Sequence, residues 1–261
     1  MVTVGVVGAL GVGATFGIAS IAGASGNPGR GRTHAAAAAV TTAAFNFDVT
    51  VSGLTPTPVD VTGTGQVDFT HDAIGVTVDL PAAVAKLIPG GSASPEVVDV
   101  VESGGTVYLQ VPSLAGLLGK PWISLALPAK ADAGGAKLFR LAASALGNVT
   151  AITAFATAHH ATVTALPSGI VDGVQATGDK IVSSFSAKGT PRTVTAEVFA
   201  DSSGRLVQGD LSTSGVNATV DVTGYGQAVT VTVPPASEVA PIPLSVVASF
   251  LGASVHGGHR R

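Results

Sequence analysis

Apolar and polar residues alternate along many short stretches of this chain, and this period of two constrains the fold more than any other feature. Successive side chains of a β-strand point to opposite faces, so alternation indicates a strand with one buried face. In FNFDVTV (45–51) every large apolar side chain falls on one face, and GTGQVDFTHDAIGVTVDLP (63–81) repeats the pattern on both sides of a polar turn. The sequence therefore predicts an antiparallel sheet with one apolar face.

Other segments with this pattern bring the expected number of strands to about ten or eleven. They are VVDVVE, TVYLQV, WISLAL, IVSSF, TVTAEVFA, RLVQGDL, NATVDV and AVTVTV. Gly-rich turns of the kind found in antiparallel hairpins separate them. Within VTGTGQVDF the glycines indicate a bulge or a tight bend of the strand.

Helical periodicity is confined to residues 81–88, 113–118 and 133–160. In the last of these, Gly147 and Asn148 interrupt the pattern, which favours a pair of helices over one. Strands and helices do not alternate along the chain, so a parallel α/β sheet is disfavoured. We predict an α+β fold, mainly β, in which one antiparallel sheet of this size curls around a few helices grouped on one side. Alternation alone does not distinguish a filled interior from an apolar cavity.

The balance of charges narrows the range of partners. Hydrophobic residues make up 46% of the 261 residues and charged residues only 11%, where a soluble domain has roughly 25%. This composition requires either a membrane segment or an unusually apolar interior. The formal net charge is -3, with no basic stripe to neutralise a phosphate backbone, so nucleic acid is not an expected partner. Cysteine is absent, which removes disulfides and thiolate metal sites.

The first 24 residues are uncharged and apolar, as expected of a signal peptide or a membrane anchor. Residues 25–40 form a predicted linker, 41–240 a single domain that contains the sheet, and 241–261 a C-terminal segment with a disordered tail. The basic n-region of a signal peptide is missing. Arg30 and Arg32 follow the apolar segment and would favour a cytoplasmic location for what comes next. Export or anchoring remains the prediction for residues 1–24.

The end of the apolar segment, SIAGASG, looks like a bacterial lipobox in which Ala24 occupies the position of the cysteine. Without a thiol no thioether-linked lipid can form there. The same residue completes a small-residue cleavage pattern, Ala22-Gly23-Ala24, which signal peptidase would cut before Ser25. The expected product is a secreted protein, or an anchored one if cleavage does not occur.

Residues that could carry chemistry do not form a recognisable constellation. His159 and His160 are adjacent, so neither a helix nor a strand would aim both at one ion, and two further histidines lie in the C-terminal HGGHRR. No G-x-S-x-G motif is present. The spacing of Asp68, Asp72 and Asp79 does not match an EF-hand loop, and alternation places them on the solvent side. We therefore expect no enzyme, no metal site and no cofactor.

Two amphipathic aromatic residues, Tyr108 and Trp122, have two interpretations. They either anchor the core against a sheet edge or line the mouth of a ligand site.

Seven segments between Phe45 and Val239 carry a further pattern. They are GTGQVDF with VTVDLP, TVYLQVP followed by GKPWISL, VDGVQAT, DSSGRLVQ, and YGQAVTVTVPPASEV. Taken in this order, they resemble the LppX/LprG-type envelope lipoproteins of actinobacteria. The resemblance implies a half-barrel similar to the LolA type of lipoprotein carrier, packed on helices and enclosing an apolar cavity. Ala24 departs from the family pattern and removes its lipid anchor.

The resemblance also implies a function, because members of that family bind acylated lipids or glycolipids and help to move them across the envelope. It predicts an exported or membrane-anchored, non-catalytic carrier whose partners are such a lipid and a membrane surface or transport partner in the envelope. The candidate cavity lining is Phe45, Phe47, Val49, Val67, Phe69, Val76, Val78, Leu109, Val111, Leu125, Phe139 and Phe155. The alternative is an envelope interaction or structural module with a filled core and no ligand.

Overall fold

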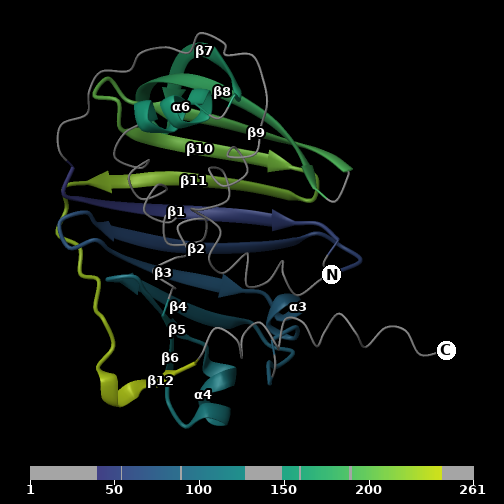
Figure 1. The fold of residues 1–261 in the computed structure, drawn as a ribbon, viewed down its shortest axis with the longest axis vertical. Coiled ribbons are helices and arrows are strands. Elements are labelled where there is room, and N and C mark those ends of the chain that lie inside the picture. The colour runs from purple at the N-terminus through teal and green to yellow at the C-terminus, as the bar shows by residue number, and fades with distance from the viewer. Residues whose placement is uncertain are drawn as a thin grey trace.

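The computed structural model describes residues 40–53, 55–88, 90–126, 149–158, 160–187 and 190–242. Within these ranges, twelve strands form one sheet in the order β12-β6-β5-β4-β3-β2-β1-β11-β10-β9-β8-β7 (Figure 1). All neighbouring strands are antiparallel except β12 and β6. The predicted fold class, mainly β with a largely antiparallel sheet and a few short helices, is confirmed.

The strands have these bounds: β1 Thr42–Val51, β2 Val59–Asp68, β3 Ala73–Leu80, β4 Glu96–Ser103, β5 Thr106–Gln110, β6 Trp122–Ala126, β7 Thr162–Val171, β8 Val174–Ala187, β9 Thr190–Ala200, β10 Leu206–Thr213, β11 Val216–Tyr225 and β12 Val239–Pro241. The described helices are α3 Ala82–Ala85, α4 Pro112–Leu118 and α6 Val149–Ala158, with a 3₁₀ turn at Ala236–Glu238.

The sheet consists of two meanders. Strands β1 to β6 each pair with the next strand in sequence, and so do β7 to β11. The two meanders meet where β1 pairs with β11, and Phe45 lies opposite Val222 at that junction. After β11 the chain returns to the far edge of the sheet, where β12 pairs with β6.

The cross-strand register assigns every side chain to one of two faces, which we call inner and outer. The inner face carries the large core residues: Phe47 of β1 lies between Val220 of β11 and Gly63 of β2, and Gly63 lies opposite Val78 of β3. The outer face is mostly polar and includes cross-strand hydrogen bonds between threonine and aspartate. This segregation is the outcome that the alternating sequence predicts.

The described helices cover the two ends of the inner face (Figure 1). Helix α6 packs on β7, β8 and β9, and its buried Val149, Ile152 and Ala156 belong to the main core. Helices α3 and α4 pack on β3 and β4 at the other end. Strands near both ends of the sheet turn away from the direction of the central strands, so the sheet is curled rather than flat (Figure 1).

Two strands were not predicted, and one predicted strand is wrong. Strand β7 was missed because it contains Pro167, which is tolerated here by an edge strand with a bulge between Leu166 and Gly169. The three-residue β12 is too short to show alternation. The segment AVTVTV was predicted as a strand, but residues 227–235 belong to no strand and cross the outer face instead.

The glycines of β2 do not mark the predicted bulge, because β2 pairs continuously with β1 and β3. The predicted helices at 81–88 and 113–118 correspond to α3 and α4, and the second part of 133–160 to α6. Residues 127–148 lie outside the described ranges.

The turn between β2 and β3 is organised by Asp68. Its carboxylate accepts hydrogen bonds from the backbone N–H groups of Thr70 (2.9 Å) and His71 (3.1 Å) and from the Thr70 hydroxyl (2.6 Å). The side chains of Thr70 and His71, in that order, lower the pKa of Asp68 from 3.8 to about 2. Because the folded-state pKa lies below the unfolded value, this carboxylate stabilises the fold above about pH 4. That contribution is lost as the pH falls from about 4 to 2.

We expect Asp68→Asn to lower the melting temperature at pH 6 and to have a smaller effect at pH 2.5, where the wild-type carboxylate is becoming protonated. Thermal unfolding at the two pH values measures this difference. Asp79→Asn, at an exposed position on β3, is the matched control. An equal effect of Asp68→Asn at both pH values would contradict the role assigned to the ionised group.

Candidate functional site

The inner face brings most of the predicted lining residues together. Eight of them lie on the inner face of adjacent strands: Phe45, Phe47, Val49, Val67, Val76, Val78, Leu109 and Leu125. Phe69 follows β2 and packs against the same core, and Val111 is buried at the start of α4. Phe155 is part of α6, but its side chain is outside what the structure describes, and Phe139 lies outside the described residues.

Two glycines of β2 give the phenyl rings of β1 their place. A Cβ atom added to Gly65 would lie 2.1 Å from Cζ of Phe45, and one added to Gly63 would lie 2.5 Å from Cζ of Phe47. The rings therefore lie directly over the glycine backbone, and their centroids are 6.5 Å apart. Any larger residue at either glycine would occupy the space of a ring. The sequence GTG is thus a packing feature of the inner face.

The inner face is not uniformly buried. Phe45, Val49, Val67 and Val78 are at most 2% exposed, which places them in a filled core. A second group of inner-face residues is only partly buried and keeps accessible apolar surface: Val76, Val107, Leu109, Val216, Val220 and Val222. These side chains come from β3, β5 and β11. The sheet therefore presents both packed core and accessible apolar wall on the same side.

Acidic residues also reach the inner face, and the sequence analysis did not single them out. Glu96 is buried, and its Oε1 accepts the backbone N–H of Ser113 at 2.6 Å, while Oε2 has no hydrogen-bond partner among the described residues. Glu102 accepts the N–H of Gly105 at 3.2 Å, and Asp179 on β8 is fully buried. Their position in the alternation was the available signal, since each falls in register with apolar neighbours. They supply polar groups within an otherwise apolar face.

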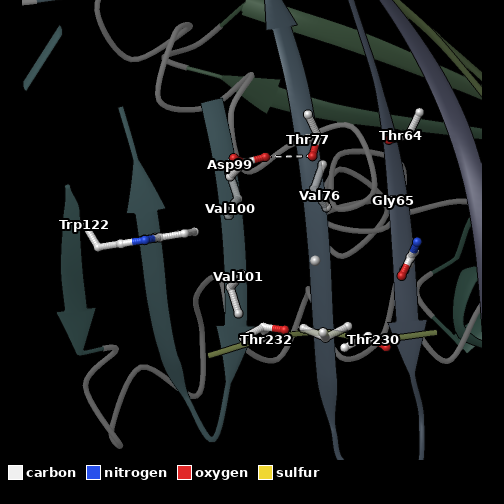
Figure 2. Close-up of a pocket in the computed structure, with 13 residues that line it drawn as sticks. Thr64, Gly65, Val76, Thr77, Asp99, Val100, Val101, Trp122, Thr230 and Thr232 are labelled. Carbon is white, nitrogen blue, oxygen red and sulfur yellow. Dashed lines mark hydrogen bonds between the residues drawn. The ribbon is translucent and has the colours of Figure 1, made fainter. Parts of the chain in front are cut away.

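A separate hollow of about 240 Å³ lies on the outer face, across β2, β3, β4 and β6 (Figure 2). One cross-strand row of outer-face residues runs Thr64, Thr77, Asp99, Gln110, Trp122, and the next row contains Gln66, Gly75 and Val101. The hollow is lined by Thr64, Gly65, Gln66, Gly75, Val76, Thr77, Asp99, Val100, Val101, Trp122, Thr230, Val231 and Thr232. We call it the outer groove.

One wall of the outer groove is formed by residues 230–232. They belong to a segment, residues 226–235, that we call the strap (Figure 2). It begins at Gly226, whose N–H donates to the Thr42 carbonyl at 3.0 Å, and the Thr42 hydroxyl donates to the Gln227 carbonyl at 2.6 Å. It ends near β12, which is paired to β6. Both ends are therefore tied to the sheet. Trp122 and Tyr108 both point to the outer face, and Trp122 is the one that lines the groove.

The other carboxylates considered from the sequence are Asp72 in the β2–β3 turn and Asp79 at the other end of β3. Asp72 and Asp79 are exposed, as the alternation predicts. Among the described residues no group of three or more His, Asp or Glu side chains is arranged to hold a metal ion. His160 is exposed, with φ of 62°, and His159 lies outside the described ranges. No described helix combines the length and the apolar character needed to cross a membrane.

Comparison with known proteins gives similarity to solved structures alone. No family model and no curated protein matches the sequence. The lipoprotein LppX from Mycobacterium tuberculosis is 13% identical, with 74% of this chain and 90% of that chain covered and a TM-score of 0.43. LprF from Mycobacterium bovis is 12% identical, covering 74% and 89%, with a TM-score of 0.41. A LolA superfamily protein from Nitrosomonas europaea is 10% identical, covering 77% and 90%, with a TM-score of 0.28. These values describe a partial similarity of chain path.

Proposed function

We propose that this protein is a non-catalytic carrier of the cell envelope that binds the acyl chains of a lipid or glycolipid against the inner face. The observation that carries the proposal is the accessible apolar surface of Val76, Leu109 and Val220, which lies beside the fully buried core on one side of a curled sheet. These three side chains pack against the core and keep part of their surface accessible. The ordered sequence segments that resemble LppX/LprG-type lipoproteins support the same function.

Binding of this kind needs no catalytic group. Transfer of an acyl chain from water to an apolar surface contributes about 0.8 kcal/mol for each buried CH₂ group. A chain that buries about ten such groups would gain about 8 kcal/mol before the cost of ordering it. An apolar wall with a few polar groups beside it is therefore sufficient for tight binding.

The proposal includes export. Residues 1–24 would act as a signal peptide or anchor, with cleavage after Ala24, and would deliver residues 41–240 to the envelope or the medium as one lipid-binding domain. With alanine at the lipobox position, attachment through a thioether-linked lipid is not part of the proposal. Mass spectrometry of the mature N-terminus in the producing cell would distinguish a cleaved from an uncleaved protein.

Native mass spectrometry of the protein purified from a lipid-rich bacterial host, followed by organic extraction, tests the binding function. We expect a stoichiometric acyl lipid that dissociates on activation in the gas phase. A protein that has no bound lipid and takes up no added lipid would favour the envelope interaction or structural module with a filled core. Lipid identification then gives the ligand class.

Leu109→Trp tests the wall directly. This side chain is partly buried on the inner face of β5. A larger ring there would fill the space that about two CH₂ groups of a ligand would otherwise occupy. We expect lipid occupancy to fall by roughly tenfold or more. Tyr108→Trp, the neighbouring residue on the outer face, is the matched control and should retain the wild-type occupancy. Equal lipid content in a folded Leu109→Trp protein would remove β5 from the binding surface.

A further inference from the structure

We propose that the outer groove is a second binding site, for the ring of a neutral saccharide. The groove lies on the face of the sheet opposite the lipid wall, so this inference does not rest on the proposed carrier function. It is carried by three features of the groove: an aromatic side chain, a carboxylate held by a hydrogen bond, and a strap that is tied to the sheet at both ends.

The aromatic side chain is Trp122, the single tryptophan of the sequence. It extends from β6 across β5 toward β4 and is only partly buried (Figure 2). A partly buried indole over a polar hollow offers an apolar surface for the C–H groups of a sugar ring and an N–H donor at its edge.

The polar groups of the groove suit a ligand rich in hydroxyl groups. Asp99 accepts the Thr77 hydroxyl at 2.7 Å, a bond that fixes its carboxylate at one wall of the groove (Figure 2). A carboxylate has acceptor positions for further hydroxyl donors, and threonine hydroxyls and glutamine amides both donate and accept. The remaining polar lining is Thr64, Gln66, Thr230 and Thr232. Hydroxyl groups, which both donate and accept, match this set.

The shape of the groove limits the ligand to a small one. Gly75 places no side chain between Gln66 and Val101, and a Cβ atom there would lie 3.6 Å from Cγ1 of Val231 in the strap. The Val231 side chain therefore covers Gly75, and a ligand ring would lie beside it, between the strap and Trp122. A volume of about 240 Å³ is below the roughly 300–1,000 Å³ of pockets that enclose drug-sized ligands, so one sugar unit fits better than a longer molecule.

Other ligand classes fit the groove less well. None of the described residues that line it is lysine, arginine or histidine, and Asp99 would repel a phosphate or carboxylate. One carboxylate is too few for a structural cation site. An acyl chain would cover the threonine hydroxyls and the Asp99 carboxylate without satisfying them. A neutral polyhydroxylated ring therefore remains as the ligand.

The test uses the fluorescence of Trp122 in the full chain as an internal reporter. We expect a saturable change on titration with at least one of the methyl glycosides of glucose, galactose, mannose or arabinose, with a Kd in the millimolar range that is typical of a single small contact surface. Calorimetric titration with the same glycosides provides an independent readout. The absence of saturable binding in both measurements would overturn the proposal.

Variants then locate the site. Asp99→Asn should weaken binding about tenfold, since it replaces charge-assisted hydrogen bonds by neutral ones. Asp60→Asn is the matched control, because Asp60 accepts the Thr50 hydroxyl at 2.7 Å on the same face but outside the groove. Trp122→Ala should abolish the binding measured by calorimetry, because it removes the apolar surface on which the ring would lie. Binding that survives both Asp99→Asn and Trp122→Ala would place the sugar elsewhere.

Comparing soluble sugars with the same sugars carried on vesicles identifies the source of the natural ligand. Methyl glycosides and soluble oligosaccharides that bind as well as the same sugar on glycolipid-containing vesicles would indicate a glycan chain as the natural ligand. Binding at least tenfold tighter to vesicles that carry the glycolipid than to the soluble sugar, with no binding to vesicles lacking it, would indicate a lipid headgroup. Loss of lipid occupancy in Leu109→Trp with unchanged sugar binding would show that the two sites fail independently.

Discussion

Gly63→Ala is expected to destabilise the protein by about 3 kcal/mol or more, a large part of the total stability of a domain. The added methyl group would lie 2.2 Å from the carbonyl oxygen of Thr77 and 2.5 Å from Cζ of Phe47. The first contact is with the backbone of β3, so no rotation of a side chain relieves it. Denaturant unfolding followed by tryptophan fluorescence measures the loss, and Gly169→Ala on β7, where nothing lies within 4 Å, is the control.

Gly65 provides the contrast that tests this explanation. Its three nearest obstacles are all ring atoms of Phe45, the closest at 2.1 Å, so the clash of Gly65→Ala is with a side chain alone. We expect the cost of Gly65→Ala to fall to about 1 kcal/mol or less when it is measured in a Phe45→Ala background. In a Phe47→Ala background, Gly63→Ala should keep most of its cost because the Thr77 carbonyl remains. Equal rescue at both positions would show that backbone crowding has no part in the requirement for Gly63.

Val98→Lys is the second change with a large expected effect. Val98 is completely buried on the inner face of β4, opposite Val78 of β3. A charged ammonium group there would lose its hydration without gaining a partner, so we expect a loss of about 4 kcal/mol or more and, at 37 °C, a largely unfolded protein. Circular dichroism and the denaturation midpoint measure the outcome.

The neighbouring residue is a stringent control for the assignment of faces. Val97 is 50% exposed on the outer face, where it lies opposite Asp79. Val97→Lys should therefore change stability by no more than about 0.5 kcal/mol, with a small gain possible from the opposite charge. If Val97→Lys were the more damaging of the two, the inner and outer faces would have to be exchanged.

The alternation of the sequence was sufficient to predict the two faces of the sheet. Phe45, Phe47 and Val49 are all buried on one side, as expected, because a period of two leaves only one way to group them. Alternation was misleading for AVTVTV, since an extended segment that crosses a sheet shows the same pattern as a strand within it. Strand β7 had the opposite problem: Pro167 hid a strand whose edge position makes the proline harmless.

The outer groove could not be predicted from the sequence, for a different reason. Its rows combine residues from β2, β3, β4 and β6 with a strap from the far end of the chain, and no local pattern shows which strands are neighbours. Trp122 was recognised as a residue of interest, but its face depends on the register between β5 and β6. The buried Glu96 and Asp179 were missed although their positions in the alternation gave a signal, because the residue type alone assigns an acid to the solvent side.

The arrangement of the sheet as two meanders also shapes the order in which it can assemble. Within each meander every strand pairs with its neighbour in sequence, so connections that are local in the chain close each contact at a small entropic cost. Pairing of Ala43 with Tyr225 and of Val239 with Trp122 instead joins distant parts of the chain. These long-range pairings raise the contact order of the protein and therefore slow its folding. We therefore expect the junction of β1 with β11 to form late in folding, after each half has gained its own shape.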